Sequence, residues 1–453
     1  MFSVDEIIQA TQGRLIQGRL TDKIIGISTD SRSLKPREAF LALRGKNFDG
    51  HNFIIRALKL KAGCLIVESL PEFSISKAVA VVRVKDTVLA LGNLARFQRQ
   101  KINLPVIAVT GSNGKTTTKE MIAWVLSKSA RVLKNEGTKN NQIGLPQTLM
   151  QLTKKDEFAV VEIGTNHFGE VNYLAEISKP NIGVITNIGP SHLEFLKDLK
   201  GVAKEKSALL DNLEKPAIAL LNADDRSFKG LVKRLIKGQQ YFSFGINKKS
   251  DFYASKIKLR SERIEFKVNS RFSFELSTLG KHNVYNALVA IAIGRLFGLS
   301  YAAMRARLAN FKFPKGRFNI VKLKKLRFID DTYNSNPFSL NAALAAFGEI
   351  ECKGRKIFIM ADMLELGGQK ELLHRQIAWS ITNTCDLLIA VGSLAQITAR
   401  AARANGLPAS QIYCCADALA ARDLLFKKIL PKTEDLILIK GSRSMKMEKV
   451  LGA

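Results

Sequence analysis

Short apolar runs alternate with helical patterns through the middle of the chain. Between residues 105 and 310 the runs are PVIAVTG (105–111), EFAVVEIG (157–164), NIGVITNIG (181–189) and AIALLNADD (217–225). Unbroken apolar runs are typical of strands that are covered on both faces, and repeated strand–helix alternation indicates a parallel sheet. We therefore predict a parallel sheet with helices on both faces, whose ligand-binding loops follow the carboxyl ends of the strands.

The same alternation resumes after a break. Pro314 and Gly316 in FKFPKGRF (311–318) end the preceding helical pattern. The apolar runs that follow are LRFIDD (326–331), RKIFIMADM (355–363), CDLLIAVGS (385–393) and DLILIKGSRS (435–444). They predict a second, smaller α/β unit with a site of its own at its strand ends.

The segment before residue 84 mixes short strands and helices. The spacing of Ser3 and Glu6 is that of a capping box at a helix start, and Gly13 is placed to end that helix. TVLALGNLARFQRQ (87–100) predicts a helix that leads into the central unit. At ~150 residues per domain, the 453 residues favour three domains, which we place at 1–84, 85–312 and 313–453.

The net charge of +30 suits anionic partners: nucleotides, nucleic acid or an acidic membrane surface. The basic residues are nevertheless scattered, and only residues 228–263 and KLKKLR (322–327) are locally dense, as a solvated surface would also be. Neither zinc-finger spacing nor the aromatic–basic pattern of an RNA-binding sheet is found. The charge alone therefore fits a polyanionic small substrate as well as nucleic acid.

The cysteines and the apolar runs narrow the class of protein. The five cysteines lack the paired spacing of a zinc site and are odd in number, which favours reduced thiols that are mostly buried. No apolar run reaches the ~18 residues of a membrane span, and the acidic start MFSVDEIIQATQG does not resemble a signal peptide. We expect a cytoplasmic globular protein.

VTGSNGKTTTKE (109–120) is the most specific motif of the chain. It lies between the apolar run at 105 and a helical pattern at 119–129, which is the strand–loop–helix setting of a phosphate-binding loop. Backbone N–H groups and the helix start can hold phosphate oxygens, while Lys115 would reach the β- and γ-phosphates and Thr116 would bind Mg²⁺. Val109 stands where the usual loop has its first glycine, and the glycines present are Gly111 and Gly114.

Two further polar residues follow neighbouring apolar runs. Glu162 ends FAVVE, where a magnesium–nucleotide site needs a hard oxygen ligand. His192 follows in TNIGPSHL (186–193), although a single histidine is more often a structural hydrogen-bonding group than a ligand. Because both lie in the same unit as the phosphate loop, the sequence favours a metal-dependent nucleotide site.

A series of segments along the chain resembles the Mur ligases, the ATP-dependent amide-forming enzymes of peptidoglycan precursor synthesis. In order, the segments are VTGSNGKTTT, EIGTN, TNIGPSHL, GVAKEKS, GKHNVYNALVA, FPKGRF, DDTYNSNP and KGSRSMKME, and they span nearly the whole chain. The family also has the shortened phosphate loop. The resemblance implies three α/β domains: a small N-terminal domain, a central P-loop-type mononucleotide-binding parallel sheet and a Rossmann-like C-terminal domain. It also implies that ATP phosphorylates a carboxylate and that an amine then attacks the acyl phosphate.

The resemblance assigns roles to individual residues. Its catalytic set is Lys115, Glu162, His192, Lys206 and Arg317. Thr116 and Glu162 would hold one Mg²⁺ and His192 a second, while Lys206 would be a carbamate that supplies an anionic oxygen ligand; Lys204 is the neighbouring alternative. The ATP-binding set is Thr110, Gly111, Ser112, Asn113, Gly114, Lys115, Thr116, Thr117, Asn283, Asn286, Arg317 and Asp331, the last two reaching in from the C-terminal domain on closure.

The substrates implied are UDP-N-acetylmuramoyl-tripeptide and D-alanyl-D-alanine. STDSR (28–32) and KNFDGHNF (46–53) resemble uridine-nucleotide-binding segments. DDTYNSNP is typical of the dipeptide-adding branch of the family rather than the diaminopimelate- or lysine-adding one. The expected substrate-binding residues are Ser31, Arg32, Asp49, Gly50, His51, Asn140, Asn141, Asn334, Asn336 and Ser442. A monomer without a specific nucleic-acid partner is expected.

Other functions are compatible with parts of the sequence. Another amide ligase of the same superfamily, either a different Mur ligase or a folylpolyglutamate synthase, would differ in its amine substrate. A basic P-loop ATPase would be stimulated by DNA or RNA, and would be expected to carry the first glycine of the loop. A binding protein without catalysis would require the set Lys115, Glu162 and His192 to be accidental.

Overall fold

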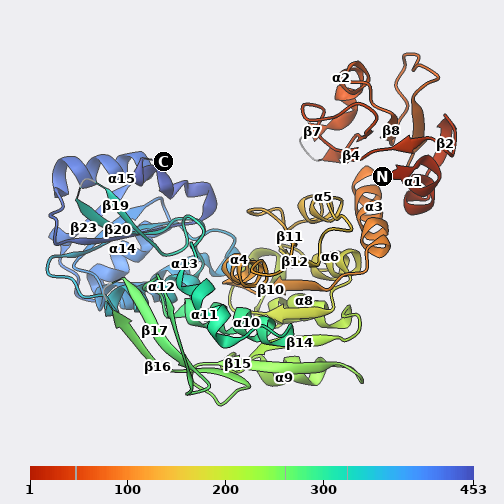
Figure 1. Ribbon diagram of the computed structural model, residues 1–453. Coiled ribbons are helices and arrows are strands. Elements are labelled where there is room, and N and C mark those ends of the chain that lie inside the picture. The colour runs from red at the N-terminus through yellow and green to blue at the C-terminus, as the bar shows by residue number, and fades with distance from the viewer. Residues whose placement is uncertain (46–47, 261, 324, 453) are drawn as a thin grey trace.

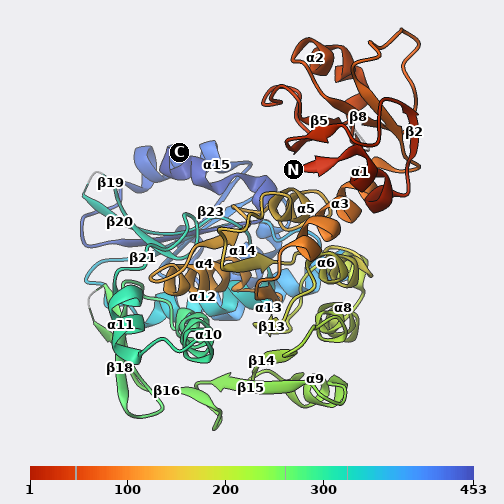
Figure 2. The same cartoon turned by 45° about the vertical axis from the view of Figure 1, so that its right-hand side comes forward.

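Three main β-sheets follow one another along the chain. The computed structural model describes residues 1–45, 48–260, 262–323 and 325–452. Figures 1 and 2 show the N-terminal sheet, in red, projecting from the rest of the molecule on the helix α3 (Thr87–Lys101), while the C-terminal sheet, in teal to blue, lies beside the central one. Lys46, Asn47, Ser261 and Lys324, which belong to segments singled out above, lie outside the described residues.

The N-terminal domain is built on a five-stranded sheet with the strand order β2-β9-β8-β5-β4. β2 pairs with β9 antiparallel, and the other neighbours are parallel. One apolar cluster packs on each face of this sheet. The elements are β1 (Phe2–Ser3), α1 (Val4–Thr11), β2 (Arg14–Gln17), β3 (Lys23–Ile24), β4 (Ile27–Ser28), β5 (Ala39–Leu41), β6 (Arg44–Gly45), β7 (Phe48–Asp49), η1 (Gly50–Phe53), α2 (Ile54–Lys59), β8 (Cys64–Val67) and β9 (Ala80–Arg83).

Helix α1 begins as predicted and ends differently. Ser3 Oγ accepts from Glu6 N–H at 3.1 Å and the Glu6 carboxylate accepts from Ser3 N–H at 2.9 Å, which confirms the capping box. The left-handed residue that closes the helix is Gln12, with φ 53°, so the prediction that Gly13 ends it was wrong. Gly13 instead lies where the chain passes close to Val82, whose Cγ1 would be 2.7 Å from a Cβ at that position.

The central sheet has nine strands in the order β11-β12-β10-β13-β14-β15-β16-β17-β18. From β11 to β16 all neighbours are parallel, and the predicted apolar runs form β10, β12, β13 and β14. The elements are β10 (Val106–Thr110), α4 (Lys115–Leu126), β11 (Val132–Lys134), α5 (Gly144–Leu149), β12 (Phe158–Glu162), α6 (Glu170–Ser178), β13 (Ile182–Ile185), α7 (Leu193–Leu196), α8 (Leu199–Asp211), β14 (Ile218–Asn222), α9 (Phe228–Arg234), β15 (Gln240–Gly245), β16 (Phe252–Arg260), β17 (Arg263–Val268), β18 (Phe272–Leu276), α10 (His282–Leu296) and α11 (Tyr301–Ala309).

Strand β10 is buried on both faces because helices cover each side of the sheet. Ile107 and Val109 pack with α4 and α10 in one apolar cluster, whereas Val106 and Ala108 pack with α3, α5 and α6 in another. β10 lies between β12 and β13, so the chain leaves it toward one side of the sheet and later returns on the other. Such a switch in strand order opens a crevice at the carboxyl end of the sheet, where ligands bind in α/β folds.

The central sheet is parallel where the predicted runs form it, and it also has an antiparallel edge that the apolar runs did not predict. β16, β17 and β18 are antiparallel neighbours. In β17, Ile264, Phe266 and Val268 are buried while Arg263 and Glu265 are exposed. A strand with one face in water shows this period-two alternation instead of an unbroken apolar run, and the prediction rested on unbroken runs.

The C-terminal sheet has the order β19-β20-β24-β21-β22-β23. β19 pairs with β20 antiparallel, the other neighbours are parallel, and the four predicted apolar runs form β20, β21, β22 and β24. The elements are β19 (Asn319–Leu323), β20 (Leu326–Asp331), α12 (Pro337–Glu349), β21 (Lys356–Ala361), η2 (Gly367–Gln369), α13 (Lys370–Thr382), β22 (Leu387–Val391), α14 (Ala395–Ala404), η3 (Ala409–Gln411), β23 (Ile412–Cys415), α15 (Ala418–Leu424), η4 (Leu425–Ile429), β24 (Leu436–Lys440), η5 (Arg443–Met445) and η6 (Met447–Leu451).

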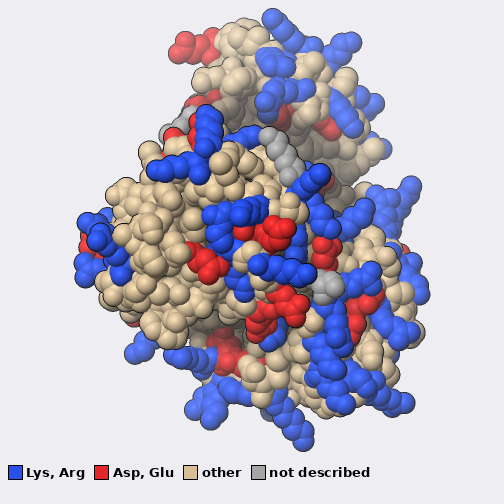
Figure 3. Space-filling model, turned by 90° about the vertical axis from the view of Figure 1, so that its left-hand side faces the viewer, with Lys and Arg blue, Asp and Glu red and all other residues tan. Residues whose placement is uncertain are grey.

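Basic and acidic side chains are interspersed on the surface. On the face shown in Figure 3, Lys and Arg side chains stand among Asp and Glu side chains. Lys322 pairs with Glu262 at 3.0 Å, which brings the two locally basic segments of the sequence together. All five cysteines are free and three of them are buried, as predicted. In the described part of the chain, no helix is long and apolar enough to cross a membrane.

Candidate active site

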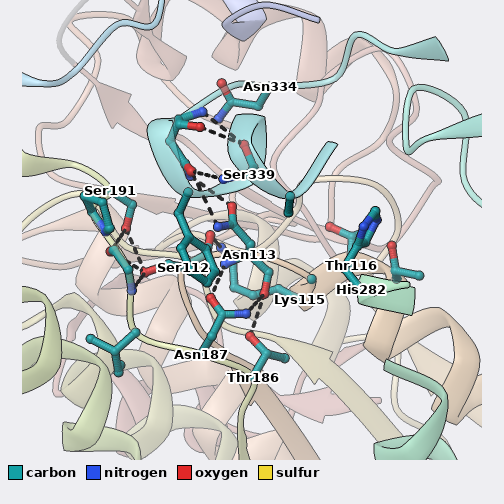
Figure 4. Close-up of a pocket in the computed structure, with 18 of the residues that line it drawn as sticks. Ser112, Asn113, Lys115, Thr116, Thr186, Asn187, Ser191, His282, Asn334 and Ser339 are labelled. Carbon is teal, nitrogen blue, oxygen red and sulfur yellow. Dashed lines mark hydrogen bonds between the residues drawn. The ribbon is translucent and has the colours of Figure 1, made fainter. Parts of the chain in front are cut away.

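A cavity of about 1120 Å³ lies between the central and C-terminal domains. One wall is formed by the loops that follow β10, β12, β13 and β14, as predicted for the carboxyl ends of parallel strands. The opposite wall comes from the loops that follow β20, β21 and β24. Figure 4 shows Asn334 and Ser339 of the C-terminal wall above Asn113 and Lys115 of the central wall.

The phosphate loop joins β10 to α4 and has little room for side chains. Gly111 has a φ of +143°, and a Cβ there would lie 2.0 Å from Thr186 Oγ1, so the backbone conformation and the close approach both require glycine. Gly114, with φ +82°, is the left-handed residue directly before α4. The Asn113 N–H donates to Asn187 Oδ1 at 3.0 Å, which fixes the loop against the segment after β13.

Lys115 is the first residue of α4 and its ammonium group turns back onto the loop. Its Nζ donates to the Gly111 carbonyl oxygen at 2.9 Å. Burial lowers the pKa of Lys115, and the carboxylate of Glu162 opposes that change. Ser112, Asn113, Gly114, Thr116 and Thr117 also line the cavity. Thr110 and Gly111 are not among the lining residues, and the Thr110 hydroxyl donates to the Ile163 carbonyl oxygen at 3.0 Å.

Thr116 and Glu162 bring two oxygens together at the edge of the loop. The Thr116 hydroxyl donates to Glu162 Oε2 at 2.8 Å, and Asn140 Nδ2 donates to Glu162 Oε1 at 2.7 Å. Hydroxyl and carboxylate oxygens are ligands that Mg²⁺ prefers, and magnesium sites commonly combine one or two carboxylates with substrate phosphates. The pair therefore fits Mg²⁺. Within the described residues no group of three or more His, Cys, Asp or Glu could hold a metal, so a cation here would need nucleotide oxygens as further ligands.

His192 lines the same cavity and is tied to the phosphate loop through its neighbours. Ser191 Oγ donates to Ser112 Oγ at 3.0 Å, and the Gly189 N–H donates to Ser112 Oγ at 2.9 Å. His192 itself has a left-handed backbone, with φ 53°. Burial lowers the pKa of His192, while its hydrogen bond to Glu365 opposes that change.

Lys206 and Lys204 differ in how far they are buried. Lys206 on α8 is 0% exposed, whereas Lys204 is exposed. Burial and the positive charge of Lys115 hold the pKa of Lys206 well below its usual range, with Glu205 and Glu162 acting in the opposite direction. A lowered pKa favours the uncharged amine, which is the form that can react with CO₂ to give a carbamate. Of the two lysines, only Lys206 therefore has the surroundings that the predicted modification needs.

Asn283 and Asn286 share one face of α10, as their spacing predicted. Asn286 Nδ2 donates to Asn283 Oδ1 at 3.0 Å, and Thr118 of α4 donates to Asn286 Oδ1 at 3.0 Å. Both asparagines are buried and both line the cavity. The pair therefore connects α10 to the helix that follows the phosphate loop.

The C-terminal domain places one cation against the central site. Arg317 Nη2 donates to Thr116 Oγ1 at 3.2 Å, and the guanidinium group stacks over Tyr333 at 3.6 Å from the ring centroid. Asp331, the last residue of β20, accepts from Lys440 Nζ at 2.6 Å. Both predicted residues thus face the cavity from the C-terminal domain.

The residues predicted for the dipeptide form part of the C-terminal wall. Asn336 is the N-cap of α12, and its Nδ2 donates to Asn113 Oδ1 across the domain boundary at 2.9 Å. The Asn334 carbonyl oxygen accepts from Lys440 Nζ at 3.0 Å. Ser442 Oγ accepts from the Leu364 N–H at 2.8 Å. All three line the cavity.

The remaining substrate predictions fall outside this cavity. Asn140 lines it, but Asn141 does not, and Asn141 Oδ1 accepts from the N–H of Gly144, the first residue of α5, at 2.9 Å. None of the predicted residues of the N-terminal domain is among the lining residues; these are Ser31, Arg32, Asp49, Gly50 and His51.

Internal contacts engage most of the predicted N-terminal residues. His51 Nδ1 lies 2.6 Å from Asp49 Oδ1, and His51 Nε2 accepts from the Glu68 N–H at 3.0 Å, so both ring nitrogens are engaged. Arg32 pairs with Asp30 at 2.7 Å on the surface. The Gly50 N–H donates to the Leu43 carbonyl oxygen at 2.7 Å. Ser31 is buried. Asp49, Gly50 and His51 thus lie at the start of η1, whereas Ser31 and Arg32 lie in the turn after β4.

Several residues of the cavity were not predicted. Lys440 is a buried charge at the end of an apolar strand, and its ammonium group pairs with Asp331. A lysine in such a run is a signal in itself, because charged side chains are rarely buried without a partner. Asn187, Tyr333 and Glu365 also line the cavity. They follow β13, β20 and β21, so the rule that loops after parallel strands carry the site could have pointed to their segments but not to the residues.

Comparisons with known proteins place the whole chain within one family. Residues 23–99 match the profile described as the Mur ligase family catalytic domain, residues 109–294 the Mur ligase middle domain, and residues 316–443 the Mur ligase glutamate ligase domain.

Individual relatives match over nearly their full length. The chain is 34% identical over 434 residues to the UDP-N-acetylmuramoyl-tripeptide–D-alanyl-D-alanine ligase of Escherichia coli strain K12, covering 94% of this chain and 93% of that protein. It is similar to a crystal structure of MurF from Acinetobacter baumannii, with a TM-score of 0.90, 32% identity and coverage of 100% and 98%. A MurF ligase from Thermotoga maritima in complex with ADP gives a TM-score of 0.83, 26% identity and coverage of 94% and 96%.

Proposed function

The chain belongs to the Mur ligase family, and we propose that it is the member that joins D-alanyl-D-alanine to UDP-N-acetylmuramoyl-tripeptide at the expense of ATP. The reaction forms an amide bond, ADP and phosphate. The product is the pentapeptide precursor of peptidoglycan. The relatives that support this substrate pair match the chain over more than nine-tenths of its length.

One observation carries the proposal: a phosphate loop and a residue of the C-terminal domain meet at the same hydroxyl group. Thr116 donates to Glu162 at 2.8 Å and accepts from Arg317 at 3.2 Å. An acyl-phosphate ligase needs this arrangement, because one domain must hold the nucleotide while the other delivers the amine. Closure of the two domains also keeps water away from a reactive acyl phosphate.

The chemistry has two balanced steps. In the first, a carboxylate oxygen of the tripeptide attacks the γ-phosphorus of ATP, and the bond from that phosphorus to the bridging oxygen of ADP breaks. In the second, the amine of the dipeptide attacks the acyl carbon, the C–N bond forms, the bond to the phosphate oxygen breaks and the nitrogen loses a proton. A carboxylate is a poor electrophile and phosphate is a good leaving group, so the enzyme mainly positions the reactants and neutralises charge.

The residues of the phosphate loop would neutralise the charge on the transferred group. Lys115 would leave the Gly111 carbonyl oxygen, to which it donates at 2.9 Å, and reach the β- and γ-phosphates. Arg317 would contact the γ-phosphate from the other side, where its stacking on Tyr333 holds the guanidinium plane. Asn286 would contact the adenine, with Asn283 beside it, and Asp331 would contact the nucleotide from the C-terminal domain.

Magnesium would be held by four of the side chains already described. Thr116 and Glu162 would hold one ion, and His192 with a carbamylated Lys206 would hold a second. Bound Mg²⁺ screens the negative charge between the phosphates and the attacking carboxylate. Lys206 supports this assignment because its burial favours the neutral amine that CO₂ modifies. The carbamate would turn a cation into an anionic oxygen ligand.

The three domains would divide the substrates among them. The N-terminal domain, residues 1–84, would hold the uridine nucleotide through Ser31, Arg32 and the turn Asp49–His51. The central domain, residues 85–312, would hold ATP, with Asn140 and Asn141 toward the muramoyl-tripeptide. The C-terminal domain, residues 313–453, would hold the dipeptide through Asn334, Asn336 and Ser442. We place the enzyme in the cytoplasm as a monomer, where ATP is available and its five free thiols stay reduced.

Amine competition tests the proposal. The full chain is incubated with MgATP, UDP-N-acetylmuramoyl-tripeptide and an equimolar mixture of D-alanyl-D-alanine, D-alanine, meso-diaminopimelate and L-lysine, and the products are identified by mass spectrometry. We expect the dipeptide adduct to dominate. Preferential addition of D-alanine, meso-diaminopimelate or L-lysine instead of the dipeptide would contradict the proposal and point to a sibling ligase.

A further inference from the structure

A hydrogen bond crosses the domain boundary at the proposed metal site. His192 Nδ1 in the central domain lies 2.7 Å from Glu365 Oε2 in the C-terminal domain. The two backbones also touch, because the Glu194 N–H donates to the Glu365 carbonyl oxygen at 3.3 Å. Both residues of the pair are left-handed, with φ 53° for His192 and 61° for Glu365. Non-glycine residues rarely adopt this conformation, and it concentrates at functional sites.

Each partner of this pair is fixed within its own domain. On the central side, Ser191 and Gly189 hold the segment before His192 against Ser112 of the phosphate loop. On the C-terminal side, the Leu364 N–H donates to Ser442 Oγ at 2.8 Å, and the Met363 N–H donates to His374 Nε2 at 3.1 Å. Glu365 therefore projects from a segment with its own internal supports, and does not depend on His192 for its position.

The hydrogen bond to Glu365 determines which ring nitrogen of His192 carries the proton. A carboxylate only accepts hydrogen bonds, so Nδ1 must carry the proton. In a neutral imidazole the lone pair then lies on Nε2, for which the described residues provide no hydrogen bond. Histidines that bind metals commonly donate their other ring N–H to a carboxylate, which fixes the tautomer and the ring orientation.

We propose that Glu365 is a positioning residue for His192, which holds the imidazole from the C-terminal domain so that Nε2 is presented to the second metal ion when the domains are together. The proposal rests on the proposed function, because His192 is a metal ligand only in that scheme. It adds that metal affinity depends on domain closure. The second ion would bind more weakly whenever the C-terminal domain swings away.

The first experiment determines the tautomer of His192 by NMR, in the absence of substrate and metal. The chain has five histidines, so ¹⁵N-histidine labelling of the full chain gives a simple long-range ¹H–¹⁵N spectrum, in which His192→Gln assigns the signal. We expect wild type to show Nδ1 protonated and Nε2 unprotonated. Glu365→Ala should lose this fixed tautomer, whereas Glu365→Gln, whose amide oxygen still accepts, should retain much of it.

The second experiment measures the affinity of the chain for the metal ion. Mn²⁺ is titrated into the full chain with the non-hydrolysable analogue AMPPCP, and free Mn²⁺ is followed by electron paramagnetic resonance. Loss of an outer hydrogen-bond partner commonly weakens a metal site 10- to 100-fold, so Glu365→Ala should weaken the second Mn²⁺ site about 10-fold or more. Glu365→Gln should lie between Glu365→Ala and wild type.

The chain offers a matched control. Glu349 of the C-terminal domain pairs with Lys281 of the central domain at 2.6 Å, so Glu349→Ala removes an inter-domain ion pair that does not touch His192. We expect Glu349→Ala to match wild type in both experiments. A wild-type spectrum and wild-type Mn²⁺ affinity in Glu365→Ala would overturn the proposal, as would equal losses in Glu349→Ala and Glu365→Ala. Because neither readout needs ligation, a failure of the proposed function would appear separately, as absent dipeptide addition by wild type.

Discussion

Arg317 and Thr116 lie in different domains and share a hydrogen bond of 3.2 Å, in which the guanidinium group donates to the hydroxyl oxygen. The same hydroxyl group donates to Glu162, so the C-terminal domain directly reaches the Thr116–Glu162 pair, which is the proposed Mg²⁺ site of the central domain. Arg317 follows the break after α11, at the start of the C-terminal domain. A movement of that domain would therefore carry this cation into or out of the nucleotide site.

The first prediction concerns Arg317. Arg317→Ala should lower kcat about 100-fold, the effect of removing one donor that stabilises charge in a transition state. The affinity for ATP should change much less, because Lys115 and the loop amides remain. Steady-state kinetics and equilibrium nucleotide binding measure the two quantities.

Arg307→Ala is the matched control for that change. Arg307 also stacks on an aromatic ring, that of Trp124 at 3.8 Å, but it lies on α11 and is not among the residues that line the cavity. Its kcat should stay near that of wild type. An unchanged kcat in Arg317→Ala would mean that the C-terminal domain does not hold the γ-phosphate.

The second prediction separates two neighbouring lysines. Lys206→Ala should abolish ligation with the fold intact, because the variant would lack the anionic ligand that the proposed carbamate on this buried lysine would supply. Lys204→Ala should ligate normally, since Lys204 is exposed on the same helix. Phosphate release and circular dichroism of both variants provide the measurements. Near-normal turnover of Lys206→Ala would exclude the carbamate role.

The third prediction concerns the metal requirement. Chelation of divalent cations should stop the reaction, and Mg²⁺ should restore it. Glu162→Ala should raise the Mg²⁺ concentration for half-maximal rate at least about tenfold, which is the lower end of the loss seen for outer partners of a metal. Since Asn140 and Thr116 both bond to this carboxylate, Glu162→Gln serves as the variant that keeps the shape. Identical Mg²⁺ dependence in wild type and both variants would remove Glu162 from the metal site.

The fourth prediction concerns the phosphate loop itself. Gly111→Ala should abolish measurable nucleotide binding, because a Cβ would lie 2.0 Å from Thr186 Oγ1 at a φ of +143°. Gly230→Ala is the control, since Gly230 lies within α9 and a Cβ at that position would have no neighbouring atom within 4 Å. That change should be neutral or stabilise the helix by about 0.5–1 kcal/mol. Nucleotide titration followed by calorimetry compares the two, and wild-type affinity in Gly111→Ala would show that the loop can adjust.

The sequence predicted the parallel parts of the sheets because burial on both faces leaves an unbroken apolar run. β10, β12, β13 and β14 all lie where such runs predicted them. The antiparallel strands β16 to β18 were not predicted because their apolar residues alternate with polar and charged ones and form no unbroken run. The left-handed residue that closes α1 is Gln12 rather than Gly13, and Gly13 lies close to Val82 of a distant strand, a proximity that no local pattern encodes.

The residues of the candidate site also differ in whether the sequence could predict them. The residues of the phosphate loop could be predicted because strand, loop and helix follow directly in the chain, and Glu162 could be predicted from its place at the end of an apolar run. Lys206 was predicted from the resemblance with Lys204 as the alternative, and the two lysines differ in burial, which depends on how α8 packs. Glu365 carried no local signal at all, because its partner His192 is 173 residues away and belongs to another domain. Contacts between domains depend on how the domains dock, and a single sequence does not contain that information in readable form.

The most direct test of the whole account is phosphate release from ATP by the full chain, measured with UDP-N-acetylmuramoyl-tripeptide alone, with D-alanyl-D-alanine alone and with both. We expect sustained release only when both substrates are present, because the dipeptide must clear the acyl phosphate before the next turnover. Release that ignores the dipeptide but rises with DNA or RNA would contradict the account, and would make the net charge of +30 the better guide to function.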